Sequence, residues 1–123
     1  MLNINAPFNS LGFGVHATNW VNALIDKDVK LGIKPIGSMQ LSPEMQEIVF
    51  KHRFTNFDAP TVVLWHPHDL AKYRGTPLIG YTVFETTELI PLEIIELASL
   101  DAIWTASQWG VAVSYTHLTL PTN

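Results

Sequence analysis

The chain has 123 residues, which is enough for one domain of ordinary size and too few for two. Hydrophobic residues make up 47% and charged residues 15%, a composition that excludes an intrinsically disordered chain. The formal net charge of −4, with only seven Lys and Arg, argues against a nucleic-acid partner, and the lack of Cys excludes a disulfide framework or a thiolate metal site.

The sequence predicts neither a targeting segment nor a membrane span. No apolar run approaches the roughly 18 residues that a spanning helix needs. The first residues lack the charged region and the long apolar core of a signal peptide. We therefore expect a cytoplasmic protein, and nothing in the sequence indicates membrane association.

The first part of the chain alternates between strand and helix patterns. Residues 2–6 alternate apolar and polar side chains, as a strand does. A turn-rich loop follows at 7–14, and residues 15–26 are expected to form a helix. The next strand is expected at 29–36.

The same alternation continues to the end of the chain. Ser42 precedes Pro43 and Glu44, which predicts a helix start with a capping hydroxyl, a proline at the first helical position and an acid in the first turn. The further expected elements are this helix to about residue 53, a strand at 61–65, a polar linker or short helix at 69–76, a strand at 78–84, a helix at 91–100, a strand at 102–105 and a helix that opens after Ser107.

Strands that are apolar on both faces and that alternate with helices predict a parallel sheet covered by helices. The predicted fold class is therefore α/β, a Rossmann-like three-layer domain. In such sheets ligands bind at the carboxyl ends of the strands. Glu85 and Ser107, which directly follow two predicted strands, are candidate functional residues for this reason.

Residues 113–123 are expected to be a non-native tail, which leaves 1–112 as the natural part. The ten residues from Val113 to Thr122 match the translation, in one frame, of a transposase sequencing adapter. The alternative is a genuine edge strand, because Thr, Tyr and Val favour strands. We expect the natural protein to have been cut near Ala112, and we assign His117 no role.

The segment Gly12-Phe13-Gly14-Val15-His16-Ala17 has a G-x-G-x-x-A spacing between the first strand and the first helix. Glycines let the backbone approach a phosphate, and a helix N-terminus supplies free N–H groups and positive potential. The alternative is that the glycines only shape a turn. No dinucleotide cofactor is expected, because the loop is long and the second strand does not end in an acid.

His66-Pro67-His68-Asp69 lies at the end of the third predicted strand. Two imidazoles and a carboxylate can ligate a divalent metal. Alternate residues of an extended segment point to opposite sides, however, and no third convergent ligand is evident. We expect no metal, and we leave open whether His66 and His68 line a cleft or belong to an ordinary polar loop.

The turn Glu85-Thr86-Thr87-Glu88 follows the fourth predicted strand. A carboxylate at the sheet edge can accept a hydrogen bond from a sugar hydroxyl, or act as a base if burial raises its pKa. The alternative is an acid that caps a helix or pins the loop. Ser107 is first of all a helix N-cap, which does not exclude substrate contact. Core packing, rather than sugar stacking, is expected for Trp20, Trp65 and Trp104.

Three segments together resemble the N-terminal domain of a GT-B glycosyltransferase of the large family 4 (group 1) type. They are Asn-Ser-Leu-Gly-Phe-Gly at 9–14, Gly-Tyr-Thr-Val-Phe-Glu-Thr-Thr at 80–87, and the segment 100–109 with its Asp-x-Ile-Trp-x-x-Ser pattern. The last is the most specific of the three. The resemblance spans most of residues 1–112.

The resemblance implies an enzyme of two Rossmann-like domains that face each other across a cleft. This chain would be the first, acceptor-side half of that GT-B fold, and incomplete. The whole enzyme would transfer a hexose-like unit from a nucleotide-sugar donor to an unknown acceptor, with retention of configuration and without a metal. The donor-binding domain is absent, so the chain alone is expected to be inactive.

The resemblance also implies roles for single residues. Gly12 and Gly14 would contact the donor diphosphate. Glu85 would stand at the end of the fourth strand, where many members carry a His that faces the transferred sugar. A carboxylate accepts hydrogen bonds and cannot stabilise phosphate charge, so its role differs from that of the His. The acceptor or cleft-lining candidates are His16, His66, His68, Thr86 and Ser107.

Two other functions remain open on the sequence alone. The first is a stand-alone Rossmann-like module that binds a small anionic ligand or a protein partner. The second is a nicotinamide-dependent oxidoreductase. A downstream domain of similar size with its own glycine loop would favour the glycosyltransferase over the binding module, and measurable binding of reduced nicotinamide would favour the oxidoreductase.

Overall fold

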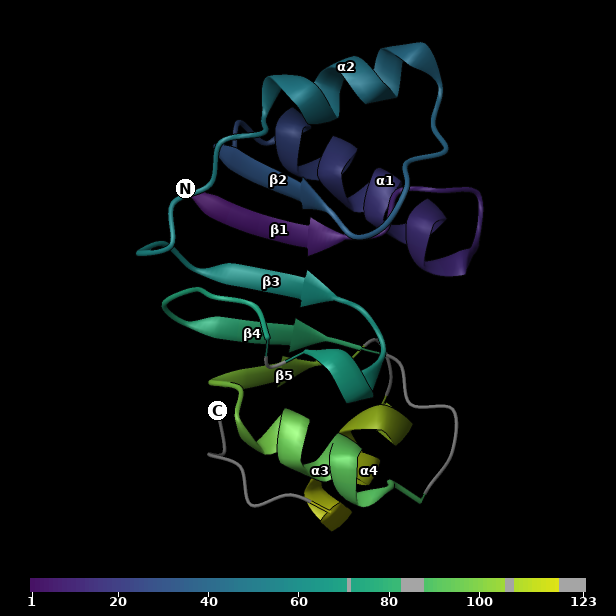
Figure 1. The fold of residues 1–123 in the computed structure, drawn as a ribbon, viewed down its shortest axis with the longest axis vertical. Coiled ribbons are helices and arrows are strands. Elements are labelled where there is room, and N and C mark those ends of the chain that lie inside the picture. Colours follow the sequence, from purple (N-terminus) through teal and green to yellow (C-terminus); the bar gives the residue numbers. More distant parts are fainter. Residues whose placement is uncertain (71, 83–87, 106–107, 118–123) are drawn as a thin grey trace.

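The centre of the molecule is a sheet of five parallel strands (Figure 1). The computed structural model describes residues 1–70, 72–82, 88–105 and 108–117. The strands follow the order β2-β1-β3-β4-β5 across the sheet. Their bounds are Leu2–Ala6 for β1, Leu31–Pro35 for β2, Thr61–Leu64 for β3, Leu78–Tyr81 for β4 and Ala102–Trp104 for β5.

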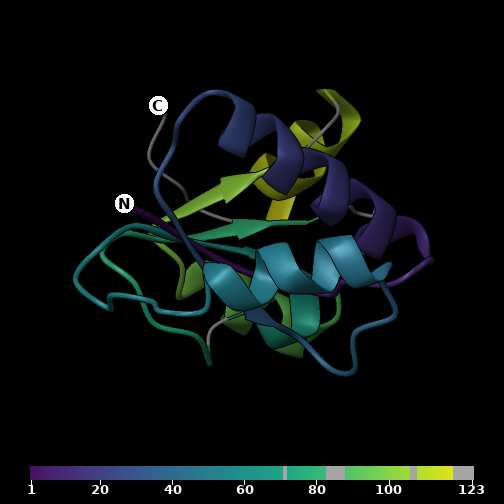
Figure 2. The same ribbon diagram turned by 90° about the horizontal axis from the view of Figure 1, so that it is seen from above.

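Helices flank the sheet and make it the middle of three layers. Figure 2 shows α1 on one side of the strands and η1 and α3 on the other, with α2 alongside the β2 edge. The fold is therefore α/β and Rossmann-like, as the sequence predicts. The helices are α1 at Gly12–Asp26, α2 at Pro43–Lys51, the short 3-10 helix η1 at Pro67–Asp69, α3 at Pro91–Ala98 and α4 at Gln108–His117.

The structure corrects the expected start of the first helix. Helix α1 begins at Gly12, one turn before the expected residue 15. The backbone of Leu11 is extended, with ψ of 170°, and its N–H donates to Oδ1 of Asn9 at 2.9 Å. This short turn precedes Gly12 directly and lets the helix begin there. Both glycines therefore lie in the first turn of the helix rather than in the loop.

The structure also corrects the alternative considered for the C-terminal tail. Residues 113–117 belong to helix α4 and not to an edge strand. Val113 is 5% exposed and packs in the core with Leu97 and Leu100. Burial of this side chain favours the helix over the strand preference of Val at this position.

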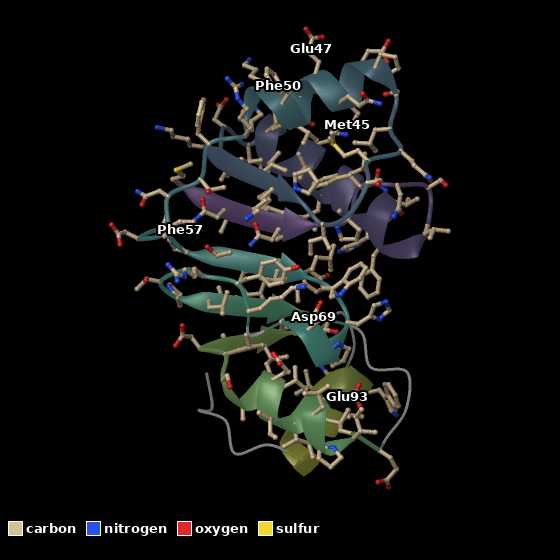
Figure 3. The ribbon with its side chains drawn as sticks, viewed as in Figure 1. Met45, Glu47, Phe50, Phe57, Asp69 and Glu93 are labelled. Atoms are coloured by element: carbon tan, nitrogen blue, oxygen red, sulfur yellow. The ribbon has the colours of Figure 1, made fainter. Side chains whose placement is uncertain are left out.

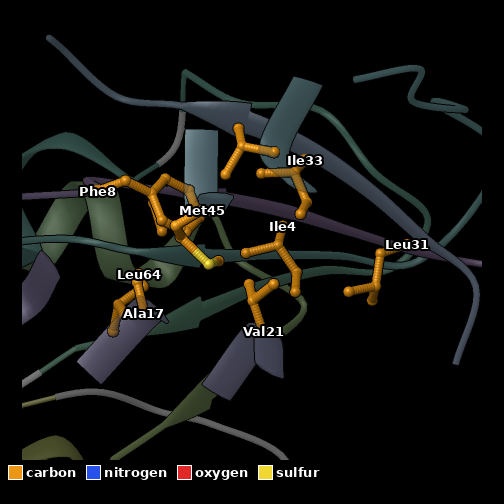
Figure 4. Packing of buried hydrophobic residues seen from close by; sticks show 10 residues of the cluster. Ile4, Phe8, Ala17, Val21, Leu31, Ile33, Met45 and Leu64 are labelled. Atoms are coloured by element: carbon orange, nitrogen blue, oxygen red, sulfur yellow. The ribbon is translucent and has the colours of Figure 1, made fainter. Parts of the chain in front are cut away.

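One face of the sheet carries an apolar core against α1 and α2. Successive strand residues point to opposite faces, so Ile4 and Ile33, which are paired in register, share a face. Ala17 and Val21 from α1 and Met45 from α2 pack on this face (Figure 4). Each of these five side chains is at most 6% exposed. This core fixes α1, and therefore its N-terminus, against the sheet.

The other face changes character halfway across the sheet. Over β3 and β4 it is apolar, since Val63 and Leu78 pack with Leu70 and Leu97. Over β1 and β2 it carries polar residues and a glycine, which are Asn3, Asn5, Gly32 and Lys34. Helices η1 and α3 cover only the apolar half.

The outer edge of β2 is partly covered by the chain that follows α2. The N–H of Ile33 donates to the carbonyl oxygen of His52 at 2.6 Å. Pairing of an edge N–H in this way removes one of the groups that could recruit another strand.

No helix in the described part of the chain is long and apolar enough to cross a membrane.

Candidate functional site

A pocket of about 530 Å³ lies at the carboxyl ends of β1, β3 and β4. The chain leaves β1 toward β2 on one side and leaves β3 toward β4 on the other, so the strand order reverses between β1 and β3. Doubly wound sheets bind ligands in the crevice that such a reversal creates. The lining residues are Pro7, Asn9, Leu11, Gly12, Phe13, His16, Leu64, Trp65, His66 and Tyr81.

The N-terminus of α1 forms one wall of this pocket. Leu11 and Gly12, at the helix start, both line it. The N-cap residue is Leu11, which makes no side-chain cap hydrogen bond to the first turn. The first N–H groups of a helix have no partner within the helix and carry its partial positive charge. This wall therefore offers backbone donors and positive potential to a bound anion.

The two glycines of the predicted phosphate loop have different surroundings. A Cβ built on Gly12 meets nothing within 4 Å, so this residue leaves open space at the pocket wall. A Cβ on Gly14 comes to 2.5 Å from both the backbone N and the backbone O of Asn9. Gly14 is buried and does not line the pocket. Its lack of a side chain allows the loop to pack on the helix.

Aromatic rings form the wall that comes from β3. The ring of Phe13 lies 4.9 Å from that of His66, edge to face, and 6.1 Å from that of Trp65. Trp65 and His66 are themselves 5.0 Å apart. Edge-to-face contacts of this kind hold rings in fixed orientations. The three rings therefore present a stable, largely apolar surface with one imidazole.

Tyr81, at the end of β4, joins a second set of rings to the first. Its ring lies 5.2 Å from the imidazole of His16, 5.8 Å from Trp20 and 6.4 Å from Trp104, each near edge to face. Trp104 is 43% exposed, so the expected core position for this side chain is wrong. Trp104 is the last residue of β5, and its ring extends the aromatic surface along the carboxyl edge of the sheet.

The structure brings three predicted site residues together and places a fourth nearby. Gly12, His16 and His66 line the same pocket. Gly14 lies in the same helical turn and faces Asn9. The side chain of His68 and the residues Glu85, Thr86 and Ser107 lie outside the described part of the structure.

Sequence reasoning missed the aromatic lining of the pocket. Phe13 stands between the two glycines, and Trp65 and Tyr81 stand at strand ends, where a parallel sheet presents side chains to its ligand edge. Their position at the carboxyl ends was the available signal. For Trp65 we expected core packing, because large aromatic side chains are highly buried on average, and we made no prediction for the side chains of Phe13 and Tyr81.

Within the residues that the structure describes, no three His, Asp or Glu side chains gather closely enough to hold a metal ion. The imidazoles of His16 and His66 belong to the two ring sets and face the pocket between them. The site thus combines backbone N–H donors, two imidazoles and a mostly apolar lining.

No protein-family model, curated protein or solved structure matches the chain.

Proposed function

We propose that this chain is the acceptor-side, N-terminal half of a GT-B glycosyltransferase that uses a nucleotide-sugar donor. The observation that carries the proposal is the pocket at the strand-order reversal. It joins the glycine segment that resembles the family to the N-terminus of α1 and to an aromatic wall. Its volume of about 530 Å³ suits a small-molecule ligand, for which pockets of roughly 300–1,000 Å³ are usual.

The chemistry of the walls fits a sugar that is linked to a diphosphate. Apolar faces of a pyranose ring pack on aromatic rings such as those of Phe13 and Trp65. The imidazoles of His16 and His66 can exchange hydrogen bonds with hydroxyl groups. The free N–H groups in the first turn of α1 can stabilise the negative charge that develops on a leaving diphosphate.

In the proposed reaction an acceptor hydroxyl oxygen forms a bond to the anomeric carbon of the sugar. The bond from that carbon to the diphosphate oxygen breaks, the diphosphate leaves with the electron pair, and the hydroxyl proton is lost to a base. Glu85 follows β4, whose Tyr81 lines the pocket, and we assign its carboxylate a hydrogen bond to a hydroxyl group of the transferred sugar. The diphosphate lies next to Gly12, at the N-terminus of α1.

The chain alone is expected to show no turnover. Catalysis depends on contacts that are stronger in the transition state than in the ground state. In the proposed enzyme most of these contacts come from a donor-binding domain beyond residue 112. Recovery of the gene downstream of Ala112 is therefore the first step, and a second domain with its own glycine loop supports the proposal.

The decisive experiment measures release of nucleoside diphosphate by the full-length protein with a panel of nucleotide sugars. With the preferred donor, Glu85→Gln is expected to lower kcat roughly 10- to 100-fold, because it replaces a charged hydrogen-bond acceptor with a neutral one. Glu88→Gln, a change of the same kind three residues away, is the matched control and is expected to leave kcat nearly unchanged.

Turnover of Glu85→Gln at the wild-type rate would remove Glu85 from the mechanism. If no nucleotide sugar is turned over and the reading frame stops shortly after Ala112, the glycosyltransferase proposal fails. The chain is then better described as a binding module whose small anionic ligand sits at the N-terminus of α1.

A further inference from the structure

A second hollow, of about 210 Å³, lies on the polar half of the sheet, away from the aromatic pocket. Its floor consists of side chains from β1, β2 and β3, and two loops form its walls. The lining residues are Asn3, Asn5, Lys34, Thr55, Phe57, Thr61, Lys72, Tyr73 and Arg74. Figure 3 shows Phe57 at the amino ends of the strands, opposite the edge that carries the aromatic pocket. The two pockets share no residue.

The first wall is the loop that carries Thr55 and Phe57, and hydrogen bonds fix this loop to the floor. The amide of Asn3 donates from Nδ2 to the carbonyl oxygen of Asn56 at 2.5 Å and accepts from the N–H of Asn56 at 3.1 Å. Nδ2 also donates to Oγ1 of Thr61 at 3.1 Å. Asn3 is 2% exposed, so a buried and fully used amide positions this loop.

The second wall is the loop that carries Lys72, Tyr73 and Arg74, and it is held next to the first wall. The N–H of Thr76 donates to the carbonyl oxygen of Ala59 at 3.1 Å. A Cβ built on Gly75 would lie 2.9 Å from the backbone N of Thr61, and closer still to its side chain. The loop that carries residues 72–74 therefore rests directly on β3. The backbone of both walls is therefore held against the sheet.

Asn5 gives the floor an unused polar group. The residue is 6% exposed and lines the hollow. Across the part of the chain that the structure describes, its side-chain amide has no hydrogen-bond partner. Thr82 Oγ1 is the side-chain atom of the described residues that is fully enclosed without a partner, so the amide of Asn5 instead borders the open space of the hollow. The amide of Asn5 is thus available to a molecule that enters the hollow.

Three cationic side chains line the same hollow as this amide. Lys34 comes from β2, and Lys72 and Arg74 come from the second wall. Among the described residues only Lys72 has a carboxylate within 4 Å, that of Asp69 at 2.8 Å. The hydrogen bond with Asp69 raises the pKa of Lys72, which keeps it cationic. Burial raises the pKa of the Tyr73 phenol, which therefore stays protonated and can donate a hydrogen bond.

We propose that this hollow binds the phosphate group of a small organic phosphate. Lys34 and Arg74 supply charge-assisted hydrogen bonds to the phosphate oxygens, and Arg presents two N–H groups in the geometry that phosphate matches. Asn5 donates from the floor. The exposed ring of Phe57 at the rim leaves room for an organic body. This site does not depend on the function proposed above, because it shares no residue with the aromatic pocket.

The test titrates the whole chain with inorganic phosphate and with pyrophosphate at constant ionic strength. Two-dimensional NMR follows the side-chain amide of Asn5 and the backbone amides of Lys34 and Arg74. A saturable shift at these groups is expected. The double variant Lys34→Met/Arg74→Met is expected to weaken binding roughly tenfold or more.

Lys27→Met is the matched control, since it removes the same charge from an exposed position outside the hollow. Equal weakening by Lys27→Met, or the lack of a shift at Asn5 in the wild type, would overturn the proposal.

Asn5→Leu separates binding from folding. It is expected to weaken binding without lowering Tm, because it replaces an unpaired amide with a side chain of similar size. A fall in Tm with unchanged phosphate affinity would contradict the role of Asn5.

Anionic lipid headgroups present the same phosphate chemistry. Cosedimentation with phosphatidylcholine vesicles that contain phosphatidic acid distinguishes the two sources. If the protein pellets with the vesicles, and if Lys34→Met/Arg74→Met abolishes pelleting while Lys27→Met does not, the bound phosphate belongs to a lipid headgroup. Saturable phosphate binding without pelleting places it on a soluble molecule. Pelleting that all variants share would count against the site.

Discussion

Gly12 and Gly14 stand two positions apart in the first turn of α1, yet they meet different surroundings. The backbone of Asn9 occupies the place of a side chain at Gly14, whereas the place at Gly12 is empty. A G-x-G-x-x-A spacing alone assigns both residues to a phosphate. It cannot distinguish a glycine that clears a ligand pocket from one that clears a packing contact, because both require only the lack of a Cβ.

Alanine at the two positions separates these tasks. Gly14→Ala is expected to lower the free energy of unfolding by about 1–3 kcal/mol, because its Cβ must displace backbone atoms of Asn9. Gly12→Ala, the matched control, is expected to cost nothing and to add up to about 1 kcal/mol through helix propensity and a less flexible unfolded chain. Urea unfolding measures both. Equal effects would show that the contact with Asn9 relaxes freely.

Among the elements, α2 has a start that was predicted correctly, because it is encoded in a few adjacent residues. Oγ of Ser42 accepts the N–H of Met45 at 3.2 Å, Pro43 is the first helical residue and Glu44 lies in the first turn. The start of α1 was placed one turn late. It depends on Asn9, whose side chain forms the local turn ahead of the helix, a signal that hydrophobic periodicity does not contain.

Removal of the Ser42 hydroxyl tests the cap of α2. Ser42→Ala is expected to lower the free energy of unfolding by about 1 kcal/mol, since it leaves the N–H of Met45 without its side-chain acceptor. Ser38→Ala, at an exposed position before the helix, is the control and is expected to change stability by less than about 0.5 kcal/mol. Thermal and urea unfolding should agree. A loss as large in Ser38→Ala would point to a general effect on this segment.

On the scale of the whole molecule, the layered α/β fold followed from the sequence because its strands are short, apolar and separated by helices. The composition of the pocket did not follow. Strand order decides that the ends of β1, β3 and β4 meet, and this order is a tertiary property that no local pattern states. Trp65 and Tyr81 became site residues only through that arrangement.

The described surface also carries an apolar area that nothing covers. Ile90, Leu92 and Ile95, at the start of α3, are each more than half exposed. Neighbouring exposed apolar residues on a folded surface promote association. We expect the chain to self-associate with rising concentration, as sedimentation velocity would show.

Two charged substitutions test this expectation. Leu92→Glu/Ile95→Lys is expected to shift the chain toward monomer while the net charge stays the same. Val15→Lys, at an exposed position of α1 outside this area, serves as the comparison and is expected to have little effect. A wild-type chain that remains monomeric at high concentration would refute the prediction.

The ring network at the carboxyl edge gives the protein an internal optical label. Trp65 lines the aromatic pocket, and Trp20 and Trp104 contact its Tyr81, so three of the four indoles lie in or beside the crevice. Indole emission responds to the polarity of its surroundings and to nearby imidazolium. The intrinsic fluorescence of the chain is therefore weighted toward the aromatic pocket, so that it can report on a ligand there without any added dye.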